Sequence, residues 1–445
     1  MSLIQKAKSY LQNNPIIRRV LRNSGYLFSG NAISAALGLV QNIFMVRLLG
    51  IEQYGLAIGI MLFATNVNRF LSFRMSEVVT KYMGEALAQG NKDRAAALAK
   101  WVGLSEAIAS VLAFLVLFIL APWYAKDPTI TTLYQFYGLY LLFNLIYETS
   151  TGVLQATDKF NRVAFANLLQ GVVTIIIVAI AYIMKWGIFE ILAAYLIGKL
   201  IAAWIVTSSA IQQLTRRVGK NWLRAPASLI SDWKSIGKFA FSTNINGTVN
   251  LFARDNIPLY IQSLLGPVAG NIALGYYNIA AKFIMLVTLP IDPFIGPTYA
   301  EITRTIAQKQ WNTTRKLLRQ VTLVGGVWTL IAGGGLVVLG WWFIPLLYGT
   351  EAAPSYIFLV ILLLGYGYSN VFNWNRPFLL ALGYPNYPLM VAAITGAVEI
   401  ALIFLFGPGG NYLTIVSIFS MYLIVSVCWN ILRGFFIIKR EETIA

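Results

Sequence analysis

Repeated apolar segments of membrane-spanning length constrain this chain more than any other feature of its sequence. A helix needs roughly 20 apolar residues to cross a bilayer, and segments of that length recur from end to end. The chain of 445 residues is 58% hydrophobic and only 11% charged, whereas a soluble domain is about one quarter charged. We therefore predict an all-α polytopic membrane protein with twelve transmembrane helices, covering residues 24–48, 55–80, 95–121, 130–156, 160–184, 187–213, 236–264, 270–298, 317–347, 355–382, 386–406 and 412–437.

The lysines and arginines lie almost entirely on one side of the predicted helices. Loops and tails on that side hold 25 of them, and the opposite side holds three, Arg47, Lys126 and Lys185. Because cytoplasmic loops are enriched in basic residues, we predict a multi-pass protein of the cell (inner) membrane with both termini cytoplasmic. The net charge of +17 then reflects this topology and an attraction to anionic membrane lipid. No compact basic domain exists to bind nucleic acid.

The two halves of the sequence repeat one another weakly. Arg47–Gly50 is echoed by Ser263–Gly266, and Leu87–Lys92 by Ile306–Trp311, at offsets of 216 and 219 residues. Since six predicted helices follow each start in the same orientation, we predict two six-helix lobes related by a parallel internal repeat. The predicted order is a cytoplasmic amphipathic N-terminus (1–22), an N-lobe (23–213), a cytoplasmic amphipathic linker (214–235), a C-lobe (236–438) and a cytoplasmic tail (439–445). Both amphipathic segments suit helices that lie on the membrane surface.

Two short motifs resemble a known family. Arg47–Gly55 closes the first predicted helix and opens the second, and Leu274–Lys282 lies in the eighth, where Pro290, Pro293 and Pro297 follow. These motifs resemble the Wzx-type polysaccharide flippases of the multidrug/oligosaccharidyl-lipid/polysaccharide exporter superfamily, and the resemblance extends over nearly the whole chain. It implies two six-helix lobes, a cavity open to one side, and flipping of undecaprenyl-pyrophosphate-linked oligosaccharide. No functional residue of that family can be aligned position by position, so none is carried over.

Six cations lie within predicted helices, where a charge at mid-membrane is disfavoured by roughly 2.5–3.5 kcal/mol. They are Arg69, Arg74, Lys199, Arg254, Lys282 and Arg376. Helical neighbours meet at i±3 and i±4, and at those spacings only Arg74 has an acidic residue, Glu77. The other five require interhelical partners, a water-filled cavity or an anionic ligand. The acidic candidates within predicted helices are Glu106, Glu148, Asp255, Asp292 and Glu399.

Prolines predict kinks in three of the helices that carry these cations. Pro258, Pro290, Pro293 and Pro377 each remove a backbone donor from the seventh, eighth or tenth predicted helix. Kinked helices are tolerated at membrane depth where they line a cavity. We therefore expect a cavity beside these helices.

Polar residues near the cations favour a site for sugars and a pyrophosphate. Asn246, Asn250 and Arg254 share one helical face at i+4 spacing; amides suit sugar hydroxyls, and arginine binds phosphate through forked hydrogen bonds. The predicted substrate-binding residues are Arg69, Arg74, Lys199, Asn246, Asn250, Arg254, Lys282, Trp374 and Arg376. The carboxylates predicted to couple an ion are Glu77, Glu148, Asp255 and Asp292. With no histidine and the single Cys428, the chain is predicted to hold no metal and no cofactor.

The leading interpretation is a transporter that flips polyprenyl-pyrophosphate-linked oligosaccharide from the cytoplasmic to the outer leaflet by alternating access, for cell-surface polysaccharide biosynthesis. Its expected partners are this lipid-linked oligosaccharide, anionic membrane lipid, and a polysaccharide polymerase and glycosyltransferases. One alternative is a cation-coupled multidrug exporter of the same superfamily, whose often cationic substrates a cationic cavity would repel. Another is a membrane glycosyltransferase or polysaccharide polymerase, which would need a catalytic residue on a sizeable outer loop. The outer loops are short, so no enzyme is expected.

Overall fold

The structure, a computed structural model, describes residues 15–72, 74–408 and 411–444, with side chains from residue 32 to 442 except at 73, 246, 409 and 410. Residues 1–14 of the predicted amphipathic N-terminus lie outside the described part of the chain. Within the described part every regular element is a helix and no strand occurs. The prediction of an all-α fold is confirmed.

The helices group into two compact units. Unit 1 comprises Met1–Gln41 and Val67–Asn244, and unit 2 comprises Asn42–Asn66 and Ile245–Ala445. Unit 2 therefore includes residues 42–66, a segment of the predicted N-lobe, because these residues pack among its helices. Each unit contains its own cluster of buried hydrophobic side chains.

The first long helix, α2 (Pro15–Leu71), changes direction at Gly50. Gly50 has a φ of 73°, in the left-handed region that glycine adopts without strain. The helix predicted over 55–80 is interrupted, because α2 ends at Leu71 and Arg74 has a φ of 50°. Three short elements then complete this segment: α3 (Met75–Val78), the π-helical turn η1 (Val79–Met83) and α4 (Gly84–Ala88).

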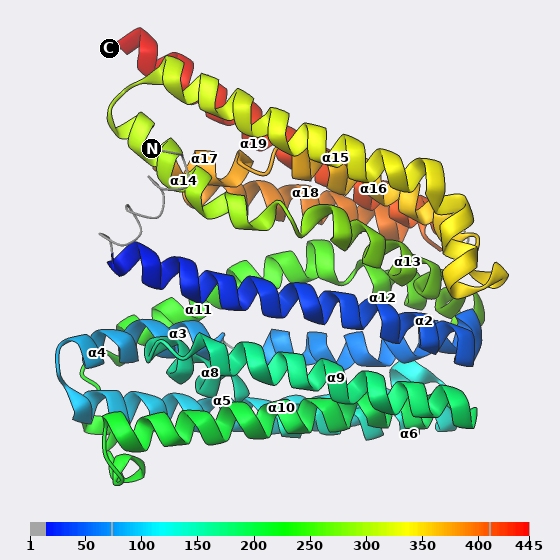
Figure 1. Cartoon of the computed structure of the whole chain (residues 1–445), viewed down its shortest axis with the longest axis horizontal. Coiled ribbons are helices and arrows are strands. Elements are labelled where there is room, and N and C mark those ends of the chain that lie inside the picture. Colours follow the sequence, from blue (N-terminus) through cyan, green and yellow to red (C-terminus); the bar gives the residue numbers. More distant parts are fainter. Residues whose placement is uncertain (1–14, 73, 409–410, 445) are drawn as a thin grey trace, which may run out of the picture. The chain divides into compact units, whose positions relative to one another are not determined.

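The rest of unit 1 consists mainly of longer helices. Its helices are α5 (Lys92–Ala125), α6 (Pro128–Tyr137), α7 (Leu139–Phe143), α8 (Tyr147–Ala156), α9 (Phe160–Met184), α10 (Ile188–Arg217) and the first part of α11 (Trp233–Asn250). Asn91 and Asp127 cap the first turns of α5 and α6 by accepting backbone N–H groups at 2.9 Å. Helix α10 packs along α9 (Figure 1), and Gly198 permits this approach because a Cβ there would overlap Thr174 of α9.

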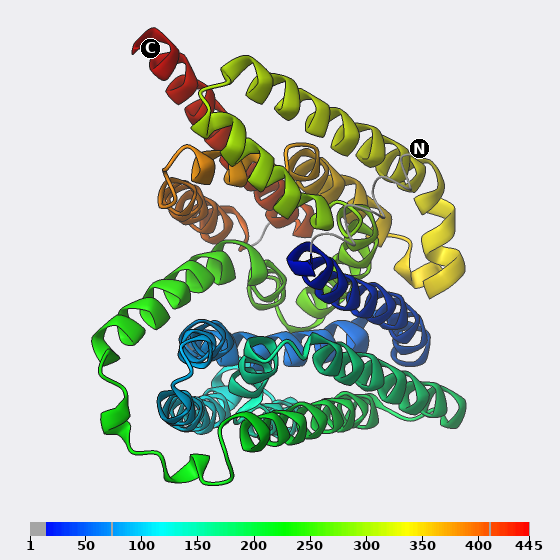
Figure 2. The same cartoon turned by 60° about the vertical axis from the view of Figure 1, so that its left-hand side comes forward.

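The segment between α10 and α11 is mostly irregular and is visible as an extended connection in Figure 2. It contains two 3₁₀ turns, η2 (Trp222–Arg224) and η3 (Ala227–Leu229). The structure thus differs from the amphipathic helix expected here, because Gly219 has a φ of 118° and Pro226 has no backbone N–H. A 2.9 Å ion pair between Arg94 and Asp232 ties the segment to α5.

Unit 2 continues from α11 through a second π-helical turn. Its elements are η4 (Leu251–Asp255), α12 (Ile257–Leu264), α13 (Pro267–Thr288), α14 (Asp292–Ala307), α15 (Trp311–Tyr348), the 3₁₀ turn η5 (Thr350–Ala352), α16 (Ser355–Val371), α17 (Asn375–Ala381), α18 (Tyr387–Phe406) and α19 (Tyr412–Ile444). Helix α16 packs against α13, α15 and α19, and α18 packs against α19 (Figure 1).

The predicted proline kinks of unit 2 are confirmed as breaks between helices. Pro258 lies in the first turn of α12, directly after the π-helical turn. Helices α13 and α14 meet at a bend of 47° next to Pro290. Pro377 lies in the first turn of α17, which follows a break after α16.

The α2 segment beyond Gly50 packs closely on α13 within unit 2. A Cβ on Gly55 would overlap the Asn271 carbonyl, and a Cβ on Gly275 would press on the facing backbone of α2. Beside this crossing, the hydroxyl of the fully buried Tyr54 lies 2.7 Å from Oδ1 of Asn278. Small residues let membrane helices approach in this way. The two motifs that resemble the flippase family therefore lie against one another in the fold.

Eight helices of the described chain are long and apolar enough to cross a membrane, or nine if the bent pair α13–α14 forms one span. The remaining predicted helices correspond to sets of shorter ones, such as α6, α7 and α8 over 130–156. The chain is therefore a multi-pass membrane protein. The count of twelve, the parallel repeat and the cytoplasmic termini stay predictions.

Candidate functional site

A polar cavity of about 220 Å³ lies within unit 2. We call it the arginine pocket. It is lined by Asn250, Arg254, Ser369, Asn375, Arg376, Pro385, Pro388, Leu389, Ala392, Tyr422, Leu423, Ser426, Val427 and Asn430. These residues come from α11, η4, α16, α17, α18, α19 and the turn before α18. The lining contains two arginines and three asparagines but no aspartate or glutamate.

Arg254 enters the arginine pocket from the π-helical turn η4. Its guanidinium lies 5.1 Å from the ring centroid of Tyr366 on α16, in cation–π contact. Asp255, Asp292 and Tyr422 lie within electrostatic range of it. π-Helical turns occur often at functional sites because they widen the helix and redirect its side chains. The turn thus presents a cation toward a cavity.

Helix α17 supplies the second arginine together with an amide. Arg376 follows Asn375 in the first turn of α17, and both line the pocket. Asn375 donates to the Phe372 carbonyl at 2.8 Å and accepts a hydrogen bond from Asn430 of α19 at 3.2 Å. The side-chain oxygen of Asn430, Oδ1, is buried and accepts no hydrogen bond from the described residues.

The arginine pocket has the chemistry to hold an anion next to hydroxyl groups. Two guanidinium groups without a lining carboxylate favour a phosphate-bearing ligand. The asparagines, with the hydroxyls of Ser369, Ser426 and Tyr422, can donate to and accept from sugar hydroxyls. The lining itself offers a cationic ligand two positive charges and no negative one.

The structure brings three of the predicted substrate-binding residues into this pocket, namely Asn250, Arg254 and Arg376. The side chain of a fourth, Asn246, lies outside the described residues. Lys282 is half-buried on α13 and does not line the pocket. Trp374 is buried among aromatic rings, at 2% exposure, and donates its indole N–H to Thr322.

The remaining predicted cations belong to unit 1. Arg69 is exposed in the last turn of α2, because α2 ends at Leu71, inside the helix predicted over 55–80. A basic residue in a last turn is favoured by the helix dipole. Arg74 forms the predicted i,i+3 ion pair with Glu77 at 2.9 Å, and both side chains are exposed. This pairing satisfies its charge locally.

Lys199 lies in a buried cluster of unit 1 formed by α5, α8 and α10. Its ammonium group lies 3.5 Å from the ring centroid of Tyr147, with Glu106 and Glu148 in electrostatic range. The Glu106 carboxylate accepts the backbone N–H groups of Glu148 and Thr149 at 2.8 and 2.7 Å, so it caps the first turn of α8 from a neighbouring helix. Lys199 therefore has acidic neighbours on other helices, as interhelical pairing requires.

The four predicted ion-coupling carboxylates occupy different places. Glu77 is exposed in its ion pair with Arg74, and Glu148 belongs to the buried cluster of unit 1. Asp255 and Asp292 lie near Arg254 in unit 2. The structure does not bring these four together, and no cluster of three or more metal-binding side chains occurs among the described residues.

Sequence reasoning missed the pocket residues Asn375, Tyr422 and Asn430. A polar side chain inside an apolar run was the available signal for the two asparagines. That signal does not tell which of many such residues face one cavity, because the answer depends on the packing of α17, α18 and α19.

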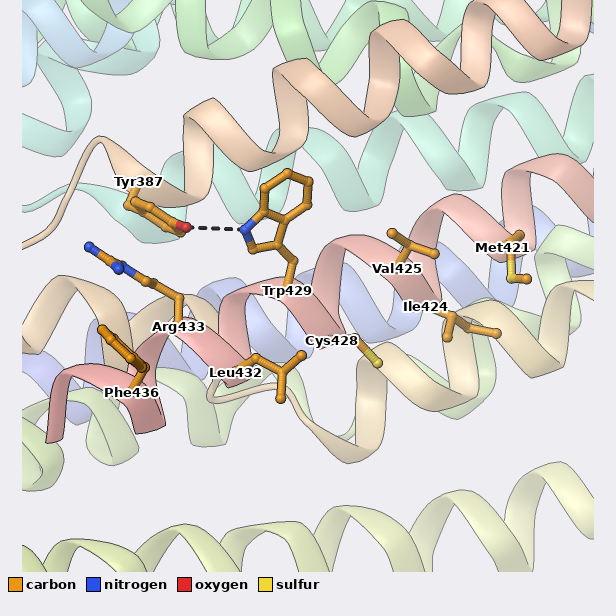
Figure 3. A pocket seen from close by; sticks show the side chains of 9 residues that line it. All are labelled: Tyr387, Met421, Ile424, Val425, Cys428, Trp429, Leu432, Arg433 and Phe436. Atoms are coloured by element: carbon orange, nitrogen blue, oxygen red, sulfur yellow. Dashed lines mark hydrogen bonds between the residues drawn. The ribbon is translucent and has the colours of Figure 1, made fainter. Parts of the chain in front are cut away.

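A second, apolar cavity of about 700 Å³ runs along α19 (Figure 3). At one end the Arg433 guanidinium lies between the rings of Tyr387 and Phe436, 5.2 and 5.7 Å from their centroids. Trp429 donates its indole N–H to the Tyr387 hydroxyl at 3.1 Å. The other lining residues are mostly aliphatic or sulfur-containing, which suits contact with lipid chains.

Solved structures define the class of protein to which this fold belongs. The chain is similar to an inward-facing multidrug resistance MATE family transporter of the MOP superfamily, with a TM-score of 0.71 at 13% identity over 92% of this chain and 96% of that one. It is also similar to the lipid II flippase MurJ in an inward closed conformation, with a TM-score of 0.69 at 16% identity over 92% and 87% of the chains. The fold is thus that of the MOP superfamily.

Sequence comparison defines the family. The profile of the polysaccharide biosynthesis protein family matches residues 20–302, and this chain belongs to that family. The chain is also similar to the inner membrane protein YghQ of Escherichia coli strain K12, at 24% identity over 348 residues, which cover 76% of this chain and 95% of that protein. The resemblance drawn from the two motifs is confirmed at the level of the polysaccharide biosynthesis family, and the fold is similar to that of MOP-superfamily transporters.

Proposed function

We propose that this protein flips polyprenyl-pyrophosphate-linked oligosaccharide from the cytoplasmic to the outer leaflet of the cell (inner) membrane. The observation that carries the proposal is the arginine pocket, in which Arg254 and Arg376 lie beside three amides without a lining carboxylate. The arginines bind the pyrophosphate and the amides bind the first sugars. Outward movement of an anion is favoured by an inside-negative potential, by about 2.3 kcal/mol per charge per 100 mV.

The proposal includes the topology and partners expected from the sequence. Twelve spans form two six-helix lobes with both termini cytoplasmic, and the lobes alternate the access of the site to the two leaflets. Anionic lipid contacts the basic cytoplasmic face. A polysaccharide polymerase and glycosyltransferases act before or after the flipping step, and the chain itself catalyses no covalent reaction.

Family membership and fold support this proposal at a coarser level. The family is named for polysaccharide biosynthesis, and one protein of similar fold is a lipid II flippase. The alternative of a cation-coupled multidrug exporter is disfavoured because two arginines would repel a cationic substrate from this pocket. A glycosyltransferase or polymerase remains an alternative of a different class.

Proteoliposomes that contain a fluorescent polyprenyl-pyrophosphate oligosaccharide test the proposal. We expect the wild-type chain to expose the labelled lipid to a quencher outside, and Arg254→Gln and Arg376→Gln each to expose it more slowly, because each weakens binding of the lipid about 10- to 100-fold. This follows from about 1.5–3 kcal/mol for a hydrogen bond to a charged group. Arg304→Gln is the matched control, because Arg304 is exposed in unit 2 and paired locally with Glu301. Full flipping by both pocket variants would refute the assignment of the pocket.

A further inference from the structure

Glu399 is a buried carboxyl group that the proposed function does not use. It lies on α18, with only 2% of its surface exposed. Neither of its carboxyl oxygens accepts a hydrogen bond from the described residues. Glu106 is also 2% exposed, yet its two oxygens accept the backbone N–H groups of Glu148 and Thr149. Burial alone therefore does not explain why Glu399 lacks partners.

The surroundings of Glu399 are apolar. It lines a crease of about 290 Å³ between α18 and α19. The lining residues are Ile394, Thr395, Val398, Glu399, Leu402, Ile418, Met421, Tyr422, Val425 and Trp429. Met421, Val425 and Trp429 also line the apolar cavity drawn in Figure 3, so the crease opens onto the same face of α19. Apart from Glu399, only Thr395 and Tyr422 bring oxygen atoms on their side chains.

An ionised carboxylate is strongly disfavoured in an apolar site without hydrogen bonds or a counter-charge. Two occupants could satisfy it, a proton or a metal ion. A hard metal ion needs several oxygen ligands, and this crease offers few beside the carboxyl group itself. A proton needs only the carboxyl group. We propose that Glu399 is a proton-binding site of unit 2, and that its occupancy is linked to the anion in the arginine pocket through Tyr422.

Tyr422 joins the two cavities because it lines both of them. It lies within electrostatic range of Glu399 on one side and of Arg254 on the other. Helix α18 also lies directly on η4, since a Cβ on Gly396 would overlap the Ala253 side chain. A movement of α18 would therefore shift both the wall of the arginine pocket and the turn that carries Arg254.

Charged and titratable groups of each neighbouring element lie around Glu399 and the arginine pocket. They are Tyr422 from α19, Tyr260 from α12, Arg254 and Asp255 from η4, and Arg376 from α17. An anion bound to the arginines adds negative charge near Tyr422, which disfavours a second negative charge on Glu399. Anion binding and proton binding therefore reinforce one another, and by linkage each raises the affinity for the other by the same factor.

Infrared difference spectroscopy of the purified protein in liposomes tests the proton site without any substrate. Above the pH at which exposed carboxyl groups have ionised, we expect a remaining band component of a protonated carboxylic acid that disappears as the pH is raised further. This component should be lost in Glu399→Gln and kept in Glu301→Gln, an exposed carboxyl of the same unit, whereas any component from the second buried carboxyl, Glu106, should be lost in Glu106→Gln instead. A Glu399→Gln spectrum identical to that of the wild type overturns the proposal. Glu399→Leu, which suits the apolar crease, serves as the second variant if Glu399→Gln does not fold.

Proton uptake on addition of inorganic pyrophosphate tests the linkage, which rests on the proposed function. In weakly buffered solution, at the pH at which the infrared band of Glu399 is half lost, the wild type should take up more protons than Glu399→Gln. The comparison of the two proteins removes the contribution of pyrophosphate's own ionisation. Equal uptake with normal binding overturns the linkage. Binding that depends on sodium rather than on pH identifies a metal site instead and overturns the proton assignment. If pyrophosphate does not bind the wild type, the function assigned to the arginine pocket fails, whereas the infrared result still decides the proton site.

Discussion

At the scale of single residues, the charges within the predicted helices of this chain are satisfied in three different ways. Arg74 has an acidic neighbour on its own helix segment, Lys199 has tyrosine rings and acidic groups from other helices, and Arg254 faces a cavity. Glu106 belongs to the second kind, since its carboxylate on α5 accepts backbone N–H groups in the first turn of α8. Charges with such fixed partners stabilise the unit, whereas charges that line cavities remain available to ligands.

This difference predicts that Glu106 is structural. Glu106→Ala should lower the free energy of unfolding by about 1–3 kcal/mol for each backbone N–H group left without an acceptor. Thermal unfolding of the detergent-solubilised protein measures the effect. Glu77→Ala should change stability far less, because Glu77 is exposed and its ion pair is solvated. Equal losses for the two variants would contradict the capping role.

At the scale of secondary-structure elements, helix breaks and close crossings define unit 2. The break before α17 places Asn375 and Arg376 at the start of a helix, and the π-helical turn η4 directs Arg254 into the same pocket. The crossing of α2 and α13 depends on glycines instead. Side-chain volume is excluded at Gly55 and Gly275 by the facing backbone.

The crossing predicts a strong difference between glycines. Gly55→Ala should destabilise the protein by about 1–3 kcal/mol, because the added methyl group overlaps the backbone of α13. Gly334→Ala should be neutral or stabilising by up to about 1 kcal/mol, since Gly334 lies inside α15 with no atom near its Cβ position. Unfolding temperatures of both variants, compared with the wild type, check the prediction. A tolerated Gly55→Ala would show that α2 and α13 can separate at that point.

At the scale of the whole molecule, the distribution of basic residues predicts the orientation in the membrane. Cysteines can report it in a Cys428→Ser background. Lys92→Cys and Arg440→Cys should stay unlabelled by a membrane-impermeant maleimide added to intact cells, whereas Thr129→Cys should be labelled, because α5 crosses the membrane between residues 92 and 129. Permeabilised cells give the control, in which all three sites react. External labelling at residue 440 would place the C-terminus outside and refute the predicted topology.

The sequence by itself determined the helical membrane class, most of the helix positions and the family. Runs of apolar residues and the side on which basic residues fall are local properties, and the bilayer selects helices for them. Proline positions likewise indicated the breaks at Pro258, Pro290 and Pro377, because a proline lacks a backbone donor and disrupts the helix at its own position.

The tertiary structure alone decided which polar residues share a site. Asn250, Arg376 and Asn430 lie far apart in the chain, and only the packing of α11, α17 and α19 brings them to one cavity. The same packing places acidic groups of other helices near Lys199. It leaves the Glu399 carboxyl group without a hydrogen-bond donor among the described residues. Each of these charges looks alike in the sequence, because a partner on another helix leaves no trace at i±3 or i±4.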